Sequence, residues 1–160
     1  MVSRKVILTG SFGVGKTSLF NRFIYNQFDE KYLTTIGVKV NKKELEVEGE
    51  AMSILLWDIA GEISQDKVPV SYFLGATGLF YVFDLTRPST HKNILSDLEY
   101  LKNIVPDAVI KVVANKKDLL NEAQLEEIKA QLPIAWDAVT SAKTGENVEE
   151  LLITLAASII

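Results

Sequence analysis

The chain has 160 residues and a mass of 17.8 kDa, which fits one domain over residues 1–160, and its 48% of hydrophobic and 24% of charged residues are typical of a globular protein. It has no cysteine, which excludes a disulfide framework, a cysteine-ligated metal site, a cysteine nucleophile and a lipid anchor on cysteine in this chain. A net charge of −4, from 17 basic and 21 acidic residues, argues against a protein whose main ligand is a nucleic-acid backbone.

The first half of the chain alternates strand-like and helix-like segments. Residues 5–9 are a short apolar run that is typical of a buried strand. Residues 16–26 predict a helix, because three large apolar side chains fall on one of its faces. Residues 38–47 and 51–57 flank the Glu-Gly-Glu turn at 48–50, so they predict a β-hairpin.

The middle of the chain continues the alternation. Residues 79–83 and 109–114 are continuous apolar runs, as expected for central parallel strands that are covered on both faces. Between them, Ser89 or Thr90 can cap a helix that runs to about Ile104. This stretch therefore predicts a strand, a helix and a second strand.

The last third predicts two more helices and one more strand. Asn121 and Gln124 have the spacing of a capping box, which predicts the start of a helix. Residues 134–138 predict a last short strand. After Asn147, apolar residues recur at helical spacing and predict a final helix.

About six strands and about five helices in alternation predict an α/β fold. The six-stranded sheet is expected to be mostly parallel, with one antiparallel strand from the hairpin and helices on both faces. Ligands of such sheets bind at the carboxyl ends of the strands, so a site is expected in the loops there. No targeting segment and no apolar run long enough to span a bilayer is apparent, so we expect a cytoplasmic protein with no membrane anchor in this chain.

The loop after the first predicted strand carries the most specific motif. Residues 10–17, Gly-Ser-Phe-Gly-Val-Gly-Lys-Thr, match the phosphate-binding pattern G-x-x-x-x-G-K-[ST], with a strand before and a helix after. Glycines let the backbone N–H groups of such a loop point at phosphate oxygens. Lys16 can place a positive charge on the outer phosphates, and the Thr17 hydroxyl can coordinate Mg²⁺. The alternative is a glycine-rich turn that binds no ligand.

Four further segments lie where loops are expected: Thr-Thr-Ile-Gly at 34–37, Asp-Ile-Ala-Gly at 58–61, Asn-Lys-Lys-Asp at 115–118 and Ser-Ala-Lys at 141–143. The last two suit a guanine base. A carboxylate such as that of Asp118 accepts two hydrogen bonds side by side, and guanine offers paired N1–H and N2–H₂ donors where adenine does not.

Other residues of these two segments can also contact the base or hold the loops around it. The stem of Lys116 can lie on the purine face, and Asn115 can tie neighbouring loops together. The backbone N–H of Ala142 can donate to the guanine oxygen.

In this order, the five motifs resemble those of the Ras superfamily of small GTPases, over essentially all 160 residues. The Rab branch is most similar, on residues 35–38, 57–58, 71–76 and 83–86, and a prokaryotic Ras-like or Rab-like relative is the alternative. The resemblance implies the G-domain fold of P-loop NTPases. It also implies a monomeric molecular switch that binds GTP or GDP with Mg²⁺ and hydrolyses GTP to GDP and phosphate.

Phosphate and metal contacts follow from the resemblance. It implies that Lys16 holds the phosphates, that the Gly61 backbone N–H meets the γ-phosphate, and that Thr17 and Thr35 bind Mg²⁺. It implies that Asp58 binds the same ion through water. Lys16, Thr35 and Gly61 are thereby expected to be catalytic, together with Glu62, which is discussed below.

The base is contacted by a second group of residues in this family. The resemblance implies that Phe28, at the end of the first helix, packs edge-on against the base. The full set of implied nucleotide-binding residues is Ser11, Phe12, Gly13, Val14, Gly15, Lys16, Thr17, Ser18, Phe28, Thr35, Asp58, Gly61, Asn115, Lys116, Asp118, Ser141, Ala142 and Lys143.

Two loops, roughly residues 29–38 and 61–71, correspond to the switch loops of the family. Contacts with the γ-phosphate and Mg²⁺ hold such loops, and hydrolysis releases them. The resemblance implies that effectors, an exchange factor and an activating protein bind there, with no role for nucleic acid.

Glu62 departs from the family, which usually has glutamine after this glycine to orient the attacking water. An ionised carboxylate only accepts hydrogen bonds, and it adds negative charge beside the γ-phosphate. Glu62 could act if it were protonated or neutralised by a partner's cation. Gln65 is an alternative source of an amide, although a solvated position on the switch surface is the simpler expectation for it.

Phe12 departs from the glycine or small polar residue usual in this loop. Its ring either crowds the path of an arginine finger or packs on a neighbouring switch residue. We expect intrinsic hydrolysis at or below the order of 10⁻⁴ s⁻¹ and little of the usual gain of roughly 10³–10⁵-fold from an arginine finger.

Two other functions stay open at this point. One is a GTP-binding scaffold or interaction module with negligible hydrolysis, which Glu62 and Phe12 favour. The other is a P-loop kinase or ATPase, against which the Asn-Lys-Lys-Asp segment argues.

Overall fold

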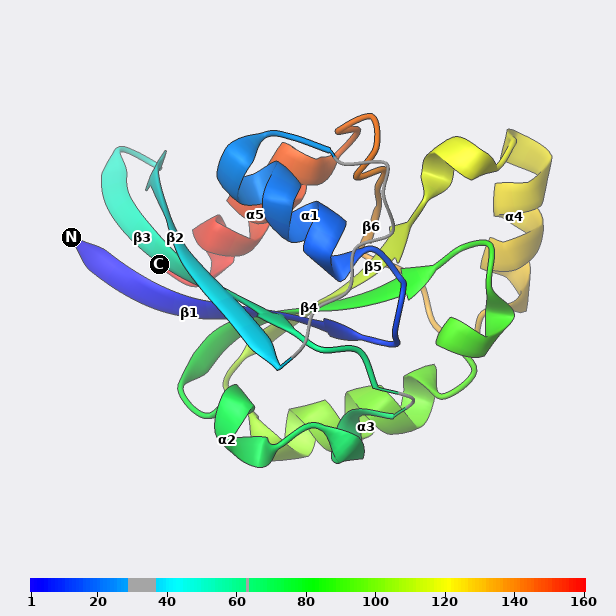
Figure 1. Ribbon diagram of the computed structural model, residues 1–160, viewed down its shortest axis with the longest axis horizontal. Helices are drawn as coiled ribbons and strands as arrows, with labels where there is room; N and C mark the ends of the chain where they lie inside the picture. The colour runs from blue at the N-terminus through cyan, green and yellow to red at the C-terminus, as the bar shows by residue number, and fades with distance from the viewer. Residues whose placement is uncertain (29–36, 63) are drawn as a thin grey trace.

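A computed structural model describes residues 1–28, 37–62 and 64–160. Its centre is a six-stranded sheet in the order β2-β3-β1-β4-β5-β6 (Figure 1). Strand β2 runs antiparallel to β3, and all the other neighbours are parallel. The sheet therefore has the predicted α/β topology. The strands are β1 (Val2–Gly10), β2 (Val38–Val47), β3 (Glu50–Ile59), β4 (Ala76–Asp84), β5 (Val109–Asn115) and β6 (Ala138–Val139).

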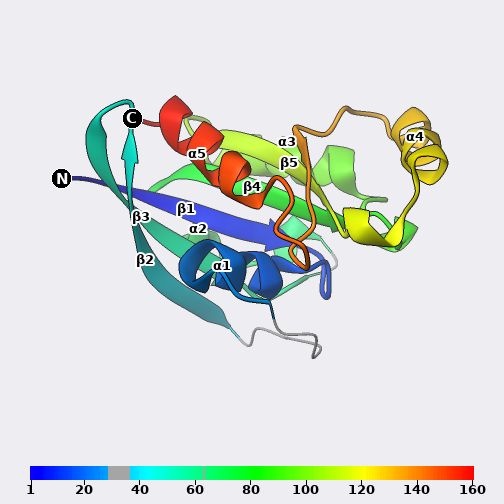
Figure 2. The same cartoon turned by 90° about the horizontal axis from the view of Figure 1, so that it is seen from above.

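Helices cover both faces of the sheet, with α1 and α5 on one face and α2 and α3 on the other (Figures 1 and 2). The α-helices are α1 (Lys16–Tyr25), α2 (Val70–Phe73), α3 (Ile94–Ile104), α4 (Glu122–Gln131) and α5 (Val148–Ser158). Among the described residues, short 3₁₀ helices lie between a strand and the following α-helix at Gln65–Lys67, Pro88–Thr90 and Lys117–Leu119.

The hydrophobic core is divided by the sheet into two clusters. Successive side chains of a strand point to opposite faces, so Val6 and Leu8 of β1 pack with α1 and α5, whereas Ile7 packs with α3. All three are fully buried. The apolar stripe predicted for the last helix is confirmed, because Leu151, Leu155 and their neighbours on the stripe are buried in the first cluster.

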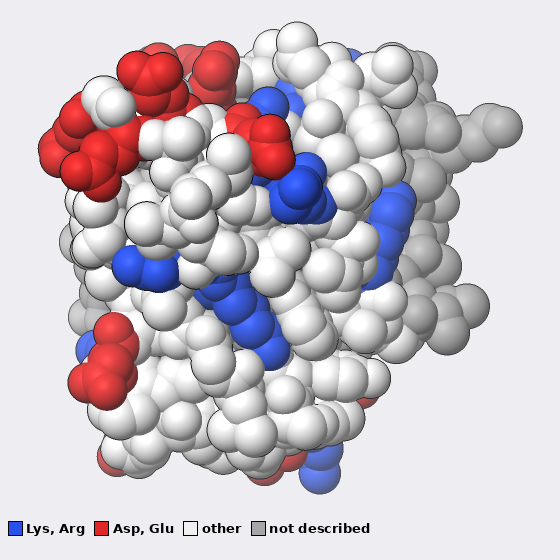
Figure 3. Space-filling view, turned by 90° about the vertical axis from the view of Figure 1, so that its left-hand side faces the viewer, with Lys and Arg blue, Asp and Glu red and all other residues white. Residues whose placement is uncertain are grey.

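The β2–β3 hairpin turns through Glu48 and Gly49, which both have positive φ, at 53° and 81°. Two such residues in a two-residue loop are typical of the turn that matches the twist of the flanking strands. Glu46 and Glu48 at this end of the hairpin are exposed. Figure 3, which faces the side of the molecule where the hairpin lies, shows acidic side chains gathered at its upper left. Part of the net negative charge is thus concentrated far from the carboxyl ends of the parallel strands.

Two predicted boundaries were wrong. The last strand does not begin at residue 134 but spans only Ala138–Val139, because the Asp137 carboxylate accepts the Val112 N–H in front of it at 2.7 Å. Helix α3 does not begin at Ser89 or Thr90. The Thr90 hydroxyl instead accepts the Asp84 N–H at 3.0 Å, and Thr90 ends a 3₁₀ turn, Pro88–Thr90, that precedes the helix.

The capping box is confirmed: Asn121 and Gln124 exchange side-chain and backbone hydrogen bonds at the start of α4.

Strands β1, β3, β4 and β5 are parallel, so their carboxyl ends share one edge of the sheet. Within the described part of the chain, no helix combines the length and the apolarity that a membrane crossing requires.

Candidate functional site

Asn115, at the carboxyl end of β5, joins three loops at this edge of the sheet. Its side chain is buried, and its Nδ2 donates to the Val14 carbonyl at 3.0 Å. Its Oδ1 accepts from Thr140 Oγ1 at 3.0 Å and from the Ala142 N–H at 3.3 Å. One amide therefore fixes the 10–17 loop, the end of β5 and the 141–143 loop relative to one another.

Glycines let the 10–17 loop run very close to its neighbours. A Cβ at Gly10 would lie 2.2 Å from the Val82 carbonyl oxygen, and one at Gly15 would lie 2.3 Å from Asn115 Nδ2. Both glycines also have positive φ, at 147° and 100°. No other residue type fits these two positions without moving the loop.

Lys16 is nearly buried at the start of α1. Its Nζ donates to the Ser11 carbonyl at 2.7 Å, so the ammonium lies inside the curve of the loop. Burial lowers the pKa of Lys16 to about 8, and the negative charge of Asp58 partly opposes this shift. The loop thus holds a cation that an anionic ligand would stabilise.

This pKa makes a testable prediction. Below about pH 8 Lys16 is charged, and above it the side chain of the ligand-free protein is neutral. Phosphate groups favour the charged form, so nucleotide binding should take up a proton above about pH 8, and affinity should fall as the pH rises. Calorimetric titration with GDP at about pH 8.5, in two buffers of different ionisation enthalpy, measures that proton. Equal enthalpies in the two buffers would contradict it.

The linked effect on folding has the opposite sign. The unfolded chain keeps the ordinary lysine pKa of 10.5, so between about pH 8 and 10.5 it binds more protons at this position than the folded chain. The Lys16 contribution to the unfolding free energy of the ligand-free protein therefore rises with pH in that window.

Thr17 and Asp58 bring two oxygen donors together beneath the loop. Thr17 Oγ1 donates to Asp58 Oδ2 at 2.7 Å, and Asp58 is fully buried at the end of β3. Hydroxyl and carboxylate oxygens are ligands that suit Mg²⁺, which usually takes its remaining ligands from water and phosphate. The donor set fits that ion. In the described ranges no group of three or more His, Asp or Glu residues could hold a metal, so phosphate and water oxygens would have to complete the shell.

Gly61 and Glu62 lie directly against the same loop. A Cβ at Gly61 would be 2.4 Å from Phe12 Cα, so only glycine permits this approach. The Glu62 N–H donates to the Gly10 carbonyl at 3.3 Å. Phe12 is 48% exposed, and its carbonyl accepts from Arg87 Nη1 at 3.1 Å. The two departures from the family pattern are therefore neighbours.

Lys116 and Asp118 lie on the other side of Asn115, where the base was expected. Lys116 Nζ contacts Asp84 Oδ2 at 2.9 Å and donates to the Gly13 carbonyl at 3.1 Å. Asp118 Oδ1 accepts from Ser141 Oγ at 2.8 Å. The Lys116 ammonium is anchored to the phosphate loop, so the side-chain stem spans the distance from the 115–118 segment to that loop.

Asp84 is a site residue that the sequence did not reveal. It is fully buried at the end of β4, and it fixes the Lys116 ammonium. The available signal was an acidic residue directly after an apolar strand, at the edge where the other loops meet. Without the topology, that aspartate resembles an ordinary turn residue.

Gln65 does not lie on the solvated surface, as had been expected, but is 1% exposed. Its Oε1 accepts from Thr9 Oγ1, and its backbone N–H donates to Asp97 Oδ1 at 3.0 Å. The other Asp97 oxygen accepts from the Tyr81 hydroxyl at 2.7 Å, and burial together with this carboxylate raises the pKa of Tyr81. The network anchors the 3₁₀ turn at Gln65–Lys67 to α3, and it engages the Gln65 side chain with Thr9.

The remaining predicted residues are placed as follows. Thr35 lies outside the described residues. Phe28 lies beyond α1, not at its end, and packs against the core cluster of α1 and α5. Ser11, Gly13 and Val14 belong to the 10–17 loop, Ser18 to the first turn of α1, and Ser141, Ala142 and Lys143 to the loop after β6.

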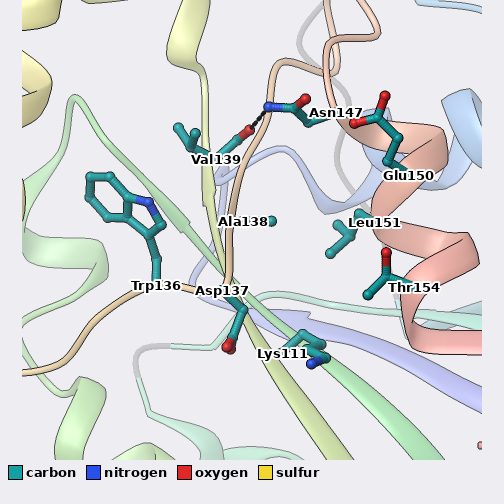
Figure 4. Close-up of a pocket in the computed structure, with 9 residues that line it drawn as sticks. All are labelled: Lys111, Trp136, Asp137, Ala138, Val139, Asn147, Glu150, Leu151 and Thr154. Atoms are coloured by element: carbon teal, nitrogen blue, oxygen red, sulfur yellow. Dashed lines mark hydrogen bonds between the residues drawn. The ribbon is translucent and has the colours of Figure 1, made fainter. Parts of the chain in front are cut away.

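A separate pocket of about 450 Å³ lies between β6 and α5 (Figure 4). Ala138 and Leu151 line it, with Lys111 and Glu150 among its charged residues. It contains none of the predicted nucleotide-binding residues. The site at the carboxyl edge of the sheet is therefore distinct from this pocket.

Comparison with known proteins gives a consistent family. The sequence model of the Ras family matches residues 5–160. The chain is 32% identical to the Ras-related protein Rab-4 of Dictyostelium discoideum, over 98% of this chain and 78% of that protein. It is 37% identical to the Ras-related proteins RABA1c of Arabidopsis thaliana and RIC2 of Oryza sativa subsp. japonica, in each case over 91% of this chain and 69% of the relative.

Proposed function

This chain belongs to the Ras family and is a Rab-like small GTPase, and from that premise we propose that it binds GTP and GDP with Mg²⁺ and hydrolyses GTP slowly. The observation that carries the proposal is the junction at Asn115. A single buried amide holds the phosphate loop beside the segments that suit a guanine base.

The nucleotide phosphates lie along the 10–17 loop in this proposal. Lys16 neutralises the outer phosphates, and Thr17 with Asp58 holds Mg²⁺, the aspartate through water. The ion, when bound, neutralises charge that develops on the phosphate oxygens. Thr35 and the Gly61 N–H complete the contacts to the γ-phosphate.

The guanine base lies against the Lys116 stem, with Asp118 accepting its two donors and the Ala142 N–H donating to its oxygen. Phe28 packs edge-on against it. The Asp118 carboxylate is aligned by Ser141, which supports this assignment.

Slow hydrolysis follows from Glu62. Its backbone N–H donates to the Gly10 carbonyl of the phosphate loop. A carboxylate at this position adds negative charge near the γ-phosphate and has no N–H to donate to the transition state. The rival function is a GTP-binding module with negligible hydrolysis. Glutamate in place of glutamine at position 62, together with the half-exposed Phe12 ring, favours it.

Loops 29–38 and 61–71 transmit the nucleotide state to effectors, an exchange factor and an activating protein. In this proposal the chain acts as a cytoplasmic monomer, and residues 1–160 fold as a single G domain.

Hydrogen exchange tests the switch. We expect residues 64–73 to exchange more slowly with a non-hydrolysable GTP analogue bound than with GDP bound, because the γ-phosphate holds this loop. Residues 122–131 of α4 serve as the internal control and should not change. Identical exchange of residues 64–73 in the two states would contradict a switch and favour the non-switching module.

A further inference from the structure

Arg22, on the last turns of α1, reaches across to the loop that follows β6. Its Nε donates to the Ala142 carbonyl at 2.9 Å, and its Nη2 donates to the Lys143 carbonyl at 2.5 Å. The planar guanidinium thus uses two of its N–H groups on two consecutive carbonyls. Gly145 lies beside the same group, since a Cβ there would be 3.7 Å from Arg22 Cζ.

The loop is held from the opposite side as well. Asn115 Oδ1 accepts the Ala142 N–H, and Asp118 Oδ1 accepts from Ser141 Oγ. Ala142 is only 4% exposed. Arg22 therefore restrains the carbonyl side of a short segment whose N–H side faces the base-binding residues.

Arg22 also lies on the helix that begins at Lys16 and Thr17. The two ends of α1 thus contact the two ends of the nucleotide site, the phosphate loop at the start and the base loop near the end. A helix is stiff over this length, so displacement at one end is transmitted to the other.

We propose that Arg22 is a positioning residue for the guanine base. It places Ala142 so that its N–H, whose bond to Asn115 Oδ1 is long at 3.3 Å, can also meet the guanine oxygen, and it couples the base loop to the phosphate loop through α1. This rests on the proposed function, and it concerns how tightly and how selectively the base is held. Arg22 does not touch the reacting phosphates.

The first measurement is the rate of nucleotide release. Fluorescent GDP bound to the full chain is displaced by excess unlabelled GDP in the presence of Mg²⁺. Arg22→Met should release it about tenfold faster than the wild type, since two hydrogen bonds from a charged group are lost. Arg22→Lys keeps the charge but not the planar fork, so its release rate should lie between the two.

The second measurement separates positioning from mere bracing of the fold. The equilibrium affinity for GDP is compared with that for 6-thioguanosine diphosphate, which keeps both base donors but offers a weaker sulfur acceptor. The wild type should prefer GDP, and Arg22→Met should lose roughly threefold or more of that preference. If Arg22 only stabilised the fold, Arg22→Met would lower the affinity for both ligands by the same factor.

Arg4 supplies a matched control. Its Nε donates to the Ile159 carbonyl at 2.9 Å, which is the same kind of contact with the end of α5, remote from the site. Arg4→Met should change neither the release rate nor the preference. If Arg22→Met does not fold, both measurements are made on Arg22→Lys instead.

The outcomes are distinct. An unchanged release rate in the Arg22 variants, or faster release with an unchanged preference for GDP, would overturn the inference while leaving the proposed function intact. Failure of the wild type to bind GDP would overturn the proposed function, and this inference with it.

Discussion

The double variant Phe12→Gly/Glu62→Gln is expected to regain the response to an arginine finger, with a gain in hydrolysis of about 10³-fold or more. The glutamine amide can both accept from the attacking water and donate to the transition state, whereas the Glu62 carboxylate only accepts. Removing the Phe12 ring opens the approach to the γ-phosphate. The measurement is single-turnover phosphate release with an activating domain that supplies an arginine finger to Rab-like GTPases.

The single variants separate the two causes. Glu62→Gln alone should accelerate the intrinsic reaction, while Phe12→Gly alone should act only when the activating domain is present. Glu62→Met is the control, because it removes the negative charge without supplying an amide. If neither Glu62→Gln nor Phe12→Gly accelerates hydrolysis, with or without the activating domain, the explanation by these two residues is wrong.

Asp118→Asn should move the base preference from guanine to xanthine. Two hydrogen bonds to a charged group are worth about 3–6 kcal/mol together, so GDP affinity should fall by roughly 10²–10⁴-fold. Xanthine replaces the amino group of guanine with a carbonyl, and an asparagine amide can donate to it. Competition binding with GDP, xanthosine diphosphate and ADP measures the change.

Asp118→Ala is the control for this substitution, since it should lower the affinity for GDP without raising the affinity for xanthosine diphosphate. A variant Asp118→Asn that keeps its preference for GDP would show that Asp118 does not contact the base. An equal loss of affinity for all three nucleotides would indicate a disturbed loop, since the Ser141 hydroxyl also donates to this carboxylate.

Much of the fold was predictable because the signals were local. The strand–helix alternation, the hairpin and the capping box at Asn121 depend on residues close together in the chain, and the structure confirms them. The boundaries that failed depend on distant partners. Thr90 bonds back to Asp84, and Asp137 bonds to Val112 on the neighbouring strand, so neither could be read from its own segment.

The same distinction applies to the site. The motif residues were recognisable by their spacing, whereas Asp84 and Arg22 were not. Arg22 follows a helical pattern in which a cation is usually a solvated residue, and only the topology brings it to Ala142, 120 positions later in the chain. Gln65 was expected at the surface because it is polar. Its burial depends on Thr9 and Asp97, which no local pattern links to it.

The most direct test of a slow GTP-binding switch is phosphate release from the wild-type protein loaded with γ-labelled GTP and Mg²⁺, in a single turnover without an activating protein. We predict that GTP stays bound and that phosphate appears at or below about 10⁻⁴ s⁻¹. Release clearly faster than this would contradict the role assigned to Glu62, and failure to load GTP would contradict the proposed function itself.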